Sequence, residues 1–173
     1  VRLKQIVGKI KNENQKILSL SRLSTKANFK LEAKKEPRDL PNFIHEYILN
    51  VAQIYFDENI SLIVNNNVKE KFIFNFVPLE IIILLDNLLN NSNKAYKDFH
   101  FTKKKQIVVS INKEDNNTLS LSFKDNAKGI EEGKLDKIFD YGFTTTQGSG
   151  IGLSYVKEII EKMGGNIKVI SNP

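Results

Sequence analysis

The sequence contains no cysteine, so neither disulfide bonds nor thiolate metal sites are available to it. Long hydrophobic runs are also missing. The longest, residues 81–85, is far shorter than the ~20 residues that cross a bilayer, and no signal-peptide pattern opens the chain. We therefore expect a cytoplasmic domain, and a first residue other than methionine leaves open a membrane-anchored parent.

Basic residues exceed acidic ones, but they lack the aromatic partners of a nucleic-acid surface. The formal net charge of +6 permits contact with phosphate at long range. The densest basic run, residues 103–105, has no interleaved aromatic residue on which bases would stack. We interpret it as a solvated loop and do not expect nucleic acid as a partner.

The chain divides into a short helical part and one main domain. Its 173 residues, 40% of them hydrophobic, suffice for one core and an appended segment. Apolar residues follow a nearly seven-residue repeat over positions 3–27, which predicts an amphipathic helix that needs a partner. Pro37 and Pro41 then interrupt helical spacing. The expected boundaries are a helical segment at 1–33, a linker at 34–42 and the main domain at 43–173.

Within the main domain, helices and strands are expected to form two layers. Helical spacing predicts helices at residues 42–56, 78–99 and 152–163. β-branched and aromatic residues predict strands at 60–64, 71–77, 106–112, 118–124 and 166–171, the first two as separate strands or as a hairpin. The strict alternation at 118–123 indicates one packed face and one wet face. The expected fold class is an α/β (α+β) two-layer sandwich, with a mixed, mainly antiparallel sheet that carries helices on one face.

Three polar side chains share one face of the helix that follows Pro78. Asn87, Asn91 and Lys94 stand at i, i+4 and i+7. An amide oxygen is a neutral ligand for a hard cation such as Mg²⁺, and a lysine one turn further on meets a phosphate as a point charge. The alternative is a solvated polar stripe.

Two further motifs suit a nucleotide. Asp125 ends an alternating strand, where its carboxylate would accept a hydrogen bond from the adenine amine and reject the guanine carbonyl; Gly129 follows it closely. An ordinary turn is the alternative. Gly148, Gly150 and Gly152 open a helix, where backbone N–H groups and the helix dipole favour phosphate. The strand and acid that a dinucleotide fold would add are missing.

The order of these motifs resembles the Bergerat-type ATP-binding fold shared by histidine kinases, gyrase-type topoisomerases, Hsp90 chaperones and MutL proteins. The resemblance covers residues 39–171. Its four boxes match residues 86–91 (N box), 125–129 (G1), 138–145 (F box) and 148–153 (G2).

The resemblance implies ATP and Mg²⁺ as cofactors. It implies Asn91 as the metal ligand and Asn87, Asn91 and Lys94 as the catalytic set. The nucleotide-binding residues that it implies are Asn91, Lys94, Asp125, Gly129, Thr145, Gly148, Gly150, Ile151, Gly152 and Leu153. Phe139 and Phe143 would anchor a short mobile lid, with plain core packing as the alternative.

Among these families, the residue at position 87 favours a kinase. Gyrase, Hsp90 and MutL relatives carry there the glutamate that activates water, and an amide cannot take that proton. The resemblance therefore implies a protein-histidine kinase of a two-component system, which passes the γ-phosphoryl group to a histidine and then to a response-regulator protein.

Some features depart from the family pattern. Ala127 replaces the first glycine of the G1 box, and His45-Glu46 imitates an H box without its proline. We interpret His45 as structural, and His100 is no better placed. The acceptor is expected outside this chain, whose segment 1–33 would be the second helix of a homodimerisation hairpin. Because the chain stops at Pro173, before the family's last strand, we expect a fragment that is inactive alone.

Two other functions stay open. A non-catalytic ATP-binding module would use the nucleotide only to shift a dimer or lid equilibrium, and Ala127 favours it. An ATP-gated clamp on nucleic acid is permitted by the charge, but Asn87 does not suit its hydrolytic cycle.

Overall fold

The computed structural model describes residues 34–56, 59–97, 104–144 and 150–171. The predicted helix at 3–27 and residue 103 of the predicted loop at 103–105 lie outside these ranges. Residue 104 has no regular structure, and Lys105 is a correction, because it is the first residue of a strand. The described residues from Lys35 onward belong to one compact unit. No helix within the described ranges combines the length and the apolar character that a membrane span requires.

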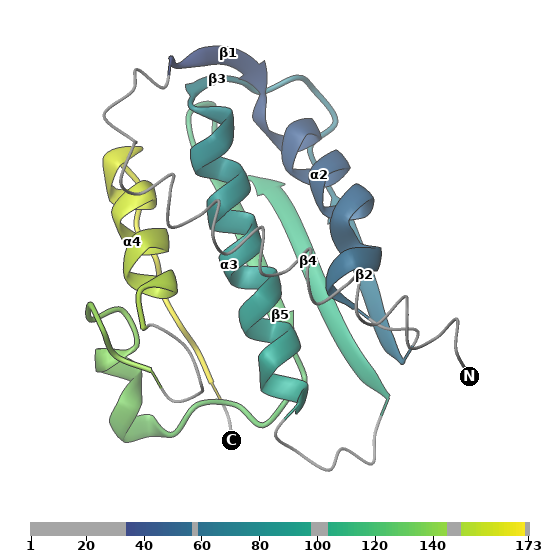
Figure 1. The fold of residues 1–173 in the computed structure, drawn as a ribbon. Coiled ribbons are helices and arrows are strands. Elements are labelled where there is room, and N and C mark those ends of the chain that lie inside the picture. Colours follow the sequence, from purple (N-terminus) through teal and green to yellow (C-terminus); the bar gives the residue numbers. More distant parts are fainter. Residues whose placement is uncertain (1–33, 57–58, 98–103, 145–149, 172–173) are drawn as a thin grey trace. The chain divides into compact units, whose positions relative to one another are not determined.

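The larger sheet has three strands in the order β2-β4-β5 (Figure 1). β2 (Ile60–Asn66) pairs in parallel with β4 (Lys105–Lys113), and β4 pairs antiparallel with β5 (Leu119–Asp125). The turn between β4 and β5 is closed by the Asn117 N–H, which donates to Asp115 Oδ1 at 2.7 Å. The mixed sheet confirms the predicted fold class.

A second, two-stranded sheet corrects two expectations. β1 (Glu36–Asp39) pairs antiparallel with β3 (Ile73–Phe76), so part of the expected linker is a strand. β2 and β3 belong to different sheets, so the hairpin alternative for them is wrong. The ring of Phe76 meets that of Phe43 edge to face at 5.3 Å, which joins β3 to the helix α2 (Leu40–Tyr55).

The core lies between the larger sheet and its helices. In β4 the side chains of Ile107, Val109 and Ile111 are fully buried, at alternate positions of the strand. They form one apolar cluster with Leu85 and Leu89 of α3 (Pro78–Lys97). Burying each such side chain stabilises the fold by about 1.5–3 kcal/mol. Because this packing fixes one side of α3 on the sheet, it also fixes where the opposite, polar side faces.

The helix α4 (Gly152–Lys162) runs beside α3 in the opposite direction (Figure 1). Near its end, Lys162 Nζ donates to Glu80 Oε1 in the first turn of α3 at 2.5 Å. Near its start, Gly152 lies against Asn87, two turns further along α3. These two contacts fix the antiparallel alignment of the helices.

The last described segment differs from its prediction. α4 ends before Gly164, as the glycine pair indicated, and Gly164 adopts a φ of +79°. Residues 166–171, expected as a strand, form no strand in the structure. The segment is instead held at Ser171, whose Oγ accepts a hydrogen bond from the Ile130 N–H at 2.7 Å.

Candidate nucleotide-binding site

The polar face of α3 carries Asn87, Asn91 and Lys94, and all three side chains are partly buried. This intermediate exposure argues against the fully solvated stripe, because side chains on a free helix face would be mostly exposed. Asn87 Nδ2 donates to the Ile83 carbonyl oxygen at 2.7 Å. That bond fixes the amide and leaves its Oδ1 atom turned to the neighbouring helix.

The start of α4 meets this polar face at Asn87. A side-chain carbon added to Gly152 would lie 2.7 Å from Asn87 Oδ1, which is closer than such atoms approach one another. Any other residue at the start of α4 would therefore have to displace the Asn87 amide from its bond with Ile83. Since α4 runs from Asn87 toward Glu80, Asn91 and Lys94 lie beyond its N-terminus, on the side to which its first N–H groups point.

The N-terminus of α4 has donors to offer. Ile151 occupies the cap position and, among the described residues, no side chain caps the helix there. Its first turn contains no acidic residue, and Ser154 Oγ donates back to the Ile151 carbonyl at 2.9 Å. The N–H groups at this end, including that of Leu153, and the helix dipole favour an anion.

The glycine loop also touches the F box. The Gly142 N–H donates to the Gly150 carbonyl at 3.0 Å, and Gly150 has a φ of +67°. A side-chain carbon on Gly150 would lie 2.8 Å from Gly142 Cα, so the two backbones are in close contact. Two other predicted site residues, Thr145 and Gly148, lie outside the described residues.

In the rest of the F box, the buried residue is neither of the two phenylalanines that the sequence suggested. Ile138 is buried, whereas Phe139 and Phe143 are only partly buried, and neither belongs to the main apolar cluster. Ile138 follows the short 3-10 helix η1 (Glu132–Lys137), in which no residue is buried. The lid-anchoring role of the two phenylalanines stays a prediction.

Asp125 is the last residue of β5 and is partly buried. One of its carboxylate oxygens, Oδ1, accepts the Ala127 N–H at 3.2 Å, which is the geometry of an Asx turn. The Ala127 methyl group packs against the core, so alanine fits where the family pattern has glycine. Gly129, two residues on, has a φ of +71°.

The sequence analysis gave no role to Tyr96, which lies outside these motifs, or to Asn126, which lies inside the G1 box. Tyr96 is 2% exposed, and its hydroxyl oxygen lies 2.6 Å from both Asn126 Oδ1 and the Gln106 carbonyl oxygen. Burial is the main reason why the pKa of Tyr96 is raised, with a smaller contribution from the charge of Asp125. The one signal that the sequence offers is an aromatic residue two positions after Lys94, the lysine predicted to contact phosphate.

The described residues contain no cluster of three His, Cys, Asp or Glu side chains that would hold a metal. A cation at this site would depend on neutral oxygens and on the phosphates of a ligand. The Asn91 amide supplies such an oxygen, and amide oxygens suit Mg²⁺.

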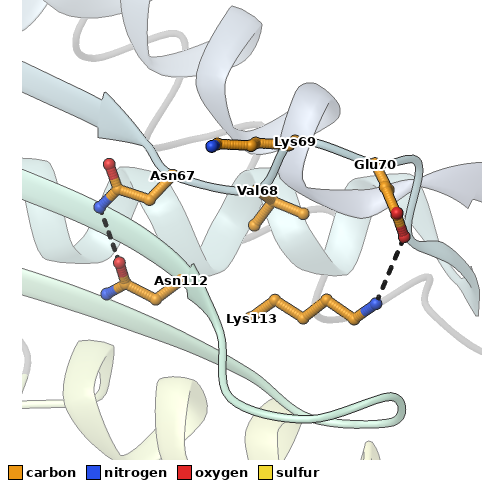
Figure 2. A pocket seen from close by; sticks show the side chains of 6 residues that line it. All are labelled: Asn67, Val68, Lys69, Glu70, Asn112 and Lys113. Carbon is orange, nitrogen blue, oxygen red and sulfur yellow. Dashed lines mark hydrogen bonds and ion pairs between the residues drawn. The ribbon is translucent and has the colours of Figure 1, made fainter.

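A separate hollow of about 470 Å³ lies at the other end of β4 (Figure 2). It is lined by Asn67, Val68, Lys69, Glu70, Asn112 and Lys113. Asn67 Nδ2 donates to Asn112 Oδ1 at 2.7 Å, and Lys113 pairs with Glu70 at 3.8 Å. Gln106 and Lys113 are seven residues apart on one strand, which separates this hollow from the Tyr96 end of β4 by roughly 23 Å. None of the predicted site residues lines it.

Comparison with known proteins shows the family to which the chain belongs. The family model of histidine kinase-, DNA gyrase B- and HSP90-like ATPases matches residues 77–173, more than half of the chain. The chain belongs to this family.

Its curated relatives are sensor kinases. The chain is 28% identical, over 90% of its length, to a probable C4-dicarboxylate sensor kinase of Bacillus subtilis. It is 29% identical, over 78% of its length, to the adaptive-response sensory kinase SasA of Prochlorococcus marinus. The chain spans only 31% and 36% of these two relatives, about a third of each.

Solved structures share the fold. The mycobacterial sensor histidine kinase MprB matches with a TM-score of 0.61 and 22% identity, over 75% of this chain and 80% of that one. The catalytic domain of histidine kinase ThkA matches with a TM-score of 0.59 and 23% identity, over 75% and 82%. Both likenesses agree with the two-layer architecture and its mixed sheet.

Proposed function

We propose that this domain binds ATP with Mg²⁺ and is the catalytic domain of a sensor histidine kinase. The observation that carries the proposal is the meeting of Asn87 with Gly152. It sets the N-terminus of α4, which no described side chain caps, against the polar face of α3, with Asn91 and Lys94 just beyond. A site built in this way offers N–H donors, an ammonium group and an amide oxygen to one polyphosphate.

The phosphate end of the site would work by position and charge. Asn91 would hold Mg²⁺, which neutralises phosphate charge when bound. Lys94 and the backbone N–H groups from Gly150 to Leu153 would bind the phosphate oxygens, and the loop residues Thr145 and Gly148 are assigned to the same task. Little covalent chemistry is left for the protein, because phosphoryl transfer depends mainly on alignment and electrostatic stabilisation.

The base end of the site would select adenine. Asp125 Oδ1 is used by the Ala127 N–H, and the carboxylate keeps a second oxygen with which to accept the adenine amine. Guanine presents a carbonyl oxygen at that position, which a carboxylate repels. Gly129 would let the backbone pass close to the flat base. ATP is therefore favoured over GTP.

The acceptor is proposed to be a histidine outside this chain. Asn87 contributes a fixed amide and no general base, so bound ATP would persist until a nucleophile other than water arrives. In the parent protein, a dimer formed through the segment 1–33 would bring in that histidine. A response regulator would then receive the phosphoryl group, and the domain would work in the cytoplasm, where ATP is found.

One observation keeps a second function open. Ala127 stands in the G1 box, and a site altered there would suit a non-catalytic module whose nucleotide only gates a dimer or the lid. The two functions differ in phosphotransfer. Incubating the full-length protein with ATP labelled at the γ-phosphate should label a histidine, giving an acid-labile phosphoprotein. Binding of ATP without any labelling would favour the gating module.

Binding itself is tested on the domain alone. Isothermal titration with MgATP and MgGTP should show binding of the first and a much weaker binding of the second, with negligible turnover. Equal affinities for the two nucleotides would contradict the role given to Asp125.

A further inference from the structure

We propose that Tyr96 is a positioning residue for base recognition: its hydroxyl group, through Asn126, holds Asp125 in place and ties it to the helix that carries Asn91 and Lys94. The inference rests on the proposed nucleotide site and adds a residue that none of the four boxes includes.

Tyr96 is buried, and its hydroxyl group lies at the centre of a set of hydrogen bonds between two strand ends. It donates its single proton to Asn126 Oδ1 or to the Gln106 carbonyl oxygen, both at 2.6 Å. It accepts the backbone N–H of Asn126 at 3.1 Å and that of Gln106 at 3.2 Å. All the donors and acceptors of this oxygen are thus engaged by two strand ends.

Asn126 adds one more residue pair to the sheet beyond Asp125. Asp125 is opposite Ile107 in the β4–β5 register, and the Asn126 N–H also reaches the Gln106 carbonyl at 3.3 Å. The Asn126 side chain spans the β4 backbone, since its Oδ1 accepts the Gln106 N–H at 2.8 Å and its Nδ2 donates to the Lys104 carbonyl at 3.0 Å. The backbone just after Asp125 is therefore fixed by a side chain, beyond the last regular pair of the sheet.

Tyr96 connects this fixed point to the metal-binding part of α3. It stands two residues after Lys94 and five after Asn91, which is roughly 7.5 Å along the helix axis. One hydroxyl group thus sets the position of the base-reading carboxylate relative to the groups proposed for Mg²⁺ and phosphate. A ligand that must meet both ends at once needs that position to be constant.

The tyrosine is kept as a neutral donor. Burial raises its pKa, so the hydroxyl group stays protonated at neutral pH. The ring is also covered by Lys105, whose Nζ lies 5.7 Å from the ring centroid. Phenylalanine would keep the ring and its packing and would lose only the hydroxyl group.

The experiment compares the affinities of Tyr96→Phe and the unaltered domain for MgATP and for MgITP. The base of ITP has a carbonyl in place of the 6-amino group of adenine. The dissociation constant for MgITP divided by that for MgATP therefore reports the Asp125 contact. We expect the ratio to fall about tenfold in Tyr96→Phe, because a lost neutral hydrogen bond is equivalent to about that factor. The strengthening of ATP binding by Mg²⁺ should be unchanged, since Asn91 is intact.

Tyr47→Phe is the matched control. The Tyr47 hydroxyl donates to Asp86 Oδ1 at 2.7 Å, between α2 and α3 and away from the proposed base. Its loss destabilises the fold in a similar way and should leave the ITP-to-ATP ratio of dissociation constants unchanged. Asn126→Ala provides a second variant with the same expected fall in the ratio, which decides the matter if Tyr96→Phe does not fold. Combined with Tyr96→Phe, it should add little further, because both act through one contact.

The outcomes separate the two claims. If the unaltered domain bound neither nucleotide, the proposed function would fail and the inference with it. If the domain prefers ATP and Asp125→Asn removes that preference while Tyr96→Phe and Asn126→Ala keep it, the nucleotide site stands and the positioning role is wrong. A fall in the ratio that Tyr47→Phe shares would equally contradict a specific role for Tyr96.

Discussion

The two ends of the candidate site are held by different kinds of contact. At the base end, the side chains of Tyr96 and Asn126 join a helix to the ends of two strands through bonds of 2.6 to 3.2 Å. At the phosphate end, backbone meets backbone or a side-chain amide, at Gly150 and at Gly152. The base end depends on hydrogen-bonding groups of two side chains. The phosphate end depends on the lack of a side chain at two glycines.

This difference determines how each end fails. A contact made by a hydroxyl or amide group is lost when that group is removed, and the loss is confined to one bond. A close approach at glycine is lost when a methyl group is added, and the whole loop has to shift. Substitutions at the base end should therefore change selectivity, whereas those at the phosphate end should change affinity and stability together.

The largest effect is expected at Asn91, the proposed metal ligand, whose side chain would act at the phosphate end. Asn91→Ala should weaken MgATP binding on the order of 100-fold, because the proposed cation loses its protein oxygen. The measurement is isothermal titration with Mg²⁺ and with a chelator. Asn93→Ala, on the same helix and off the polar face, should bind like the unaltered domain. Loss of the helical circular dichroism signal in Asn91→Ala would mark a structural residue instead.

The next effect is expected at Gly150. Gly150→Ala should lower the free energy of unfolding by about 2 kcal/mol and also weaken ATP binding, because the positive φ and the contact with Gly142 both oppose a side chain. Gly142→Ala is its matched control, with a φ of +83° but open space at the added carbon. It should lose only about 1 kcal/mol. Equal losses for both, by denaturant titration, would show that the close contact is unimportant.

A smaller loss is expected where α3 and α4 are joined. Lys162→Met removes the partner of Glu80, which is 8% exposed, and should lower the free energy of unfolding by about 1–2 kcal/mol. Lys157→Met removes a more exposed pair with Glu161 at 3.8 Å and should lower it by less than about 0.5 kcal/mol. Urea denaturation gives the free energy of unfolding of both variants. Equal losses would contradict a special role of the Lys162–Glu80 contact in joining α3 and α4.

The smallest effect is expected from alkaline pH. Burial raises the pKa of Tyr96 and Tyr155 above the ordinary 10.0, and the bond with Glu80 raises that of Lys162 above 10.5. The folded state therefore holds these protons more tightly than the unfolded state. Its stability should be full below pH 10 and should decline as the pH rises through these values. Denaturation between pH 8 and 11 checks the decline, which Tyr155→Phe should reduce; stability that increases with pH would contradict it.

Local sequence patterns predicted the three described helices of the main domain and the strands of the larger sheet. α3, β4 and β5 have clear periodicity because each packs one face on the same core. The predictions of a linker where β1 lies and of a strand at 166–171 were wrong for one reason. Pairing with a distant partner such as β3 decides whether a short segment becomes a strand, and no local pattern reports that partner.

The site shows the same limit. Residue types and their order were sufficient to select Asn87 and Gly152, because amides and glycines at such spacings suit a phosphate site. Their contact across two helices was not predictable, since it depends on the alignment that Lys162 and Glu80 help to fix. Tyr96 and Asn126 were missed because a tyrosine at the end of a helix and an asparagine at the end of a strand are usually packing and turn residues.

The most direct test is a crystal structure of this domain with Mg²⁺ and a non-hydrolysable ATP analogue. The account predicts that the purine amine lies within hydrogen-bond distance of the Asp125 carboxylate, and that the metal is coordinated by the Asn91 amide oxygen. The phosphates should face the N-terminus of α4. A purine bound elsewhere, or a metal without Asn91 among its ligands, would contradict it.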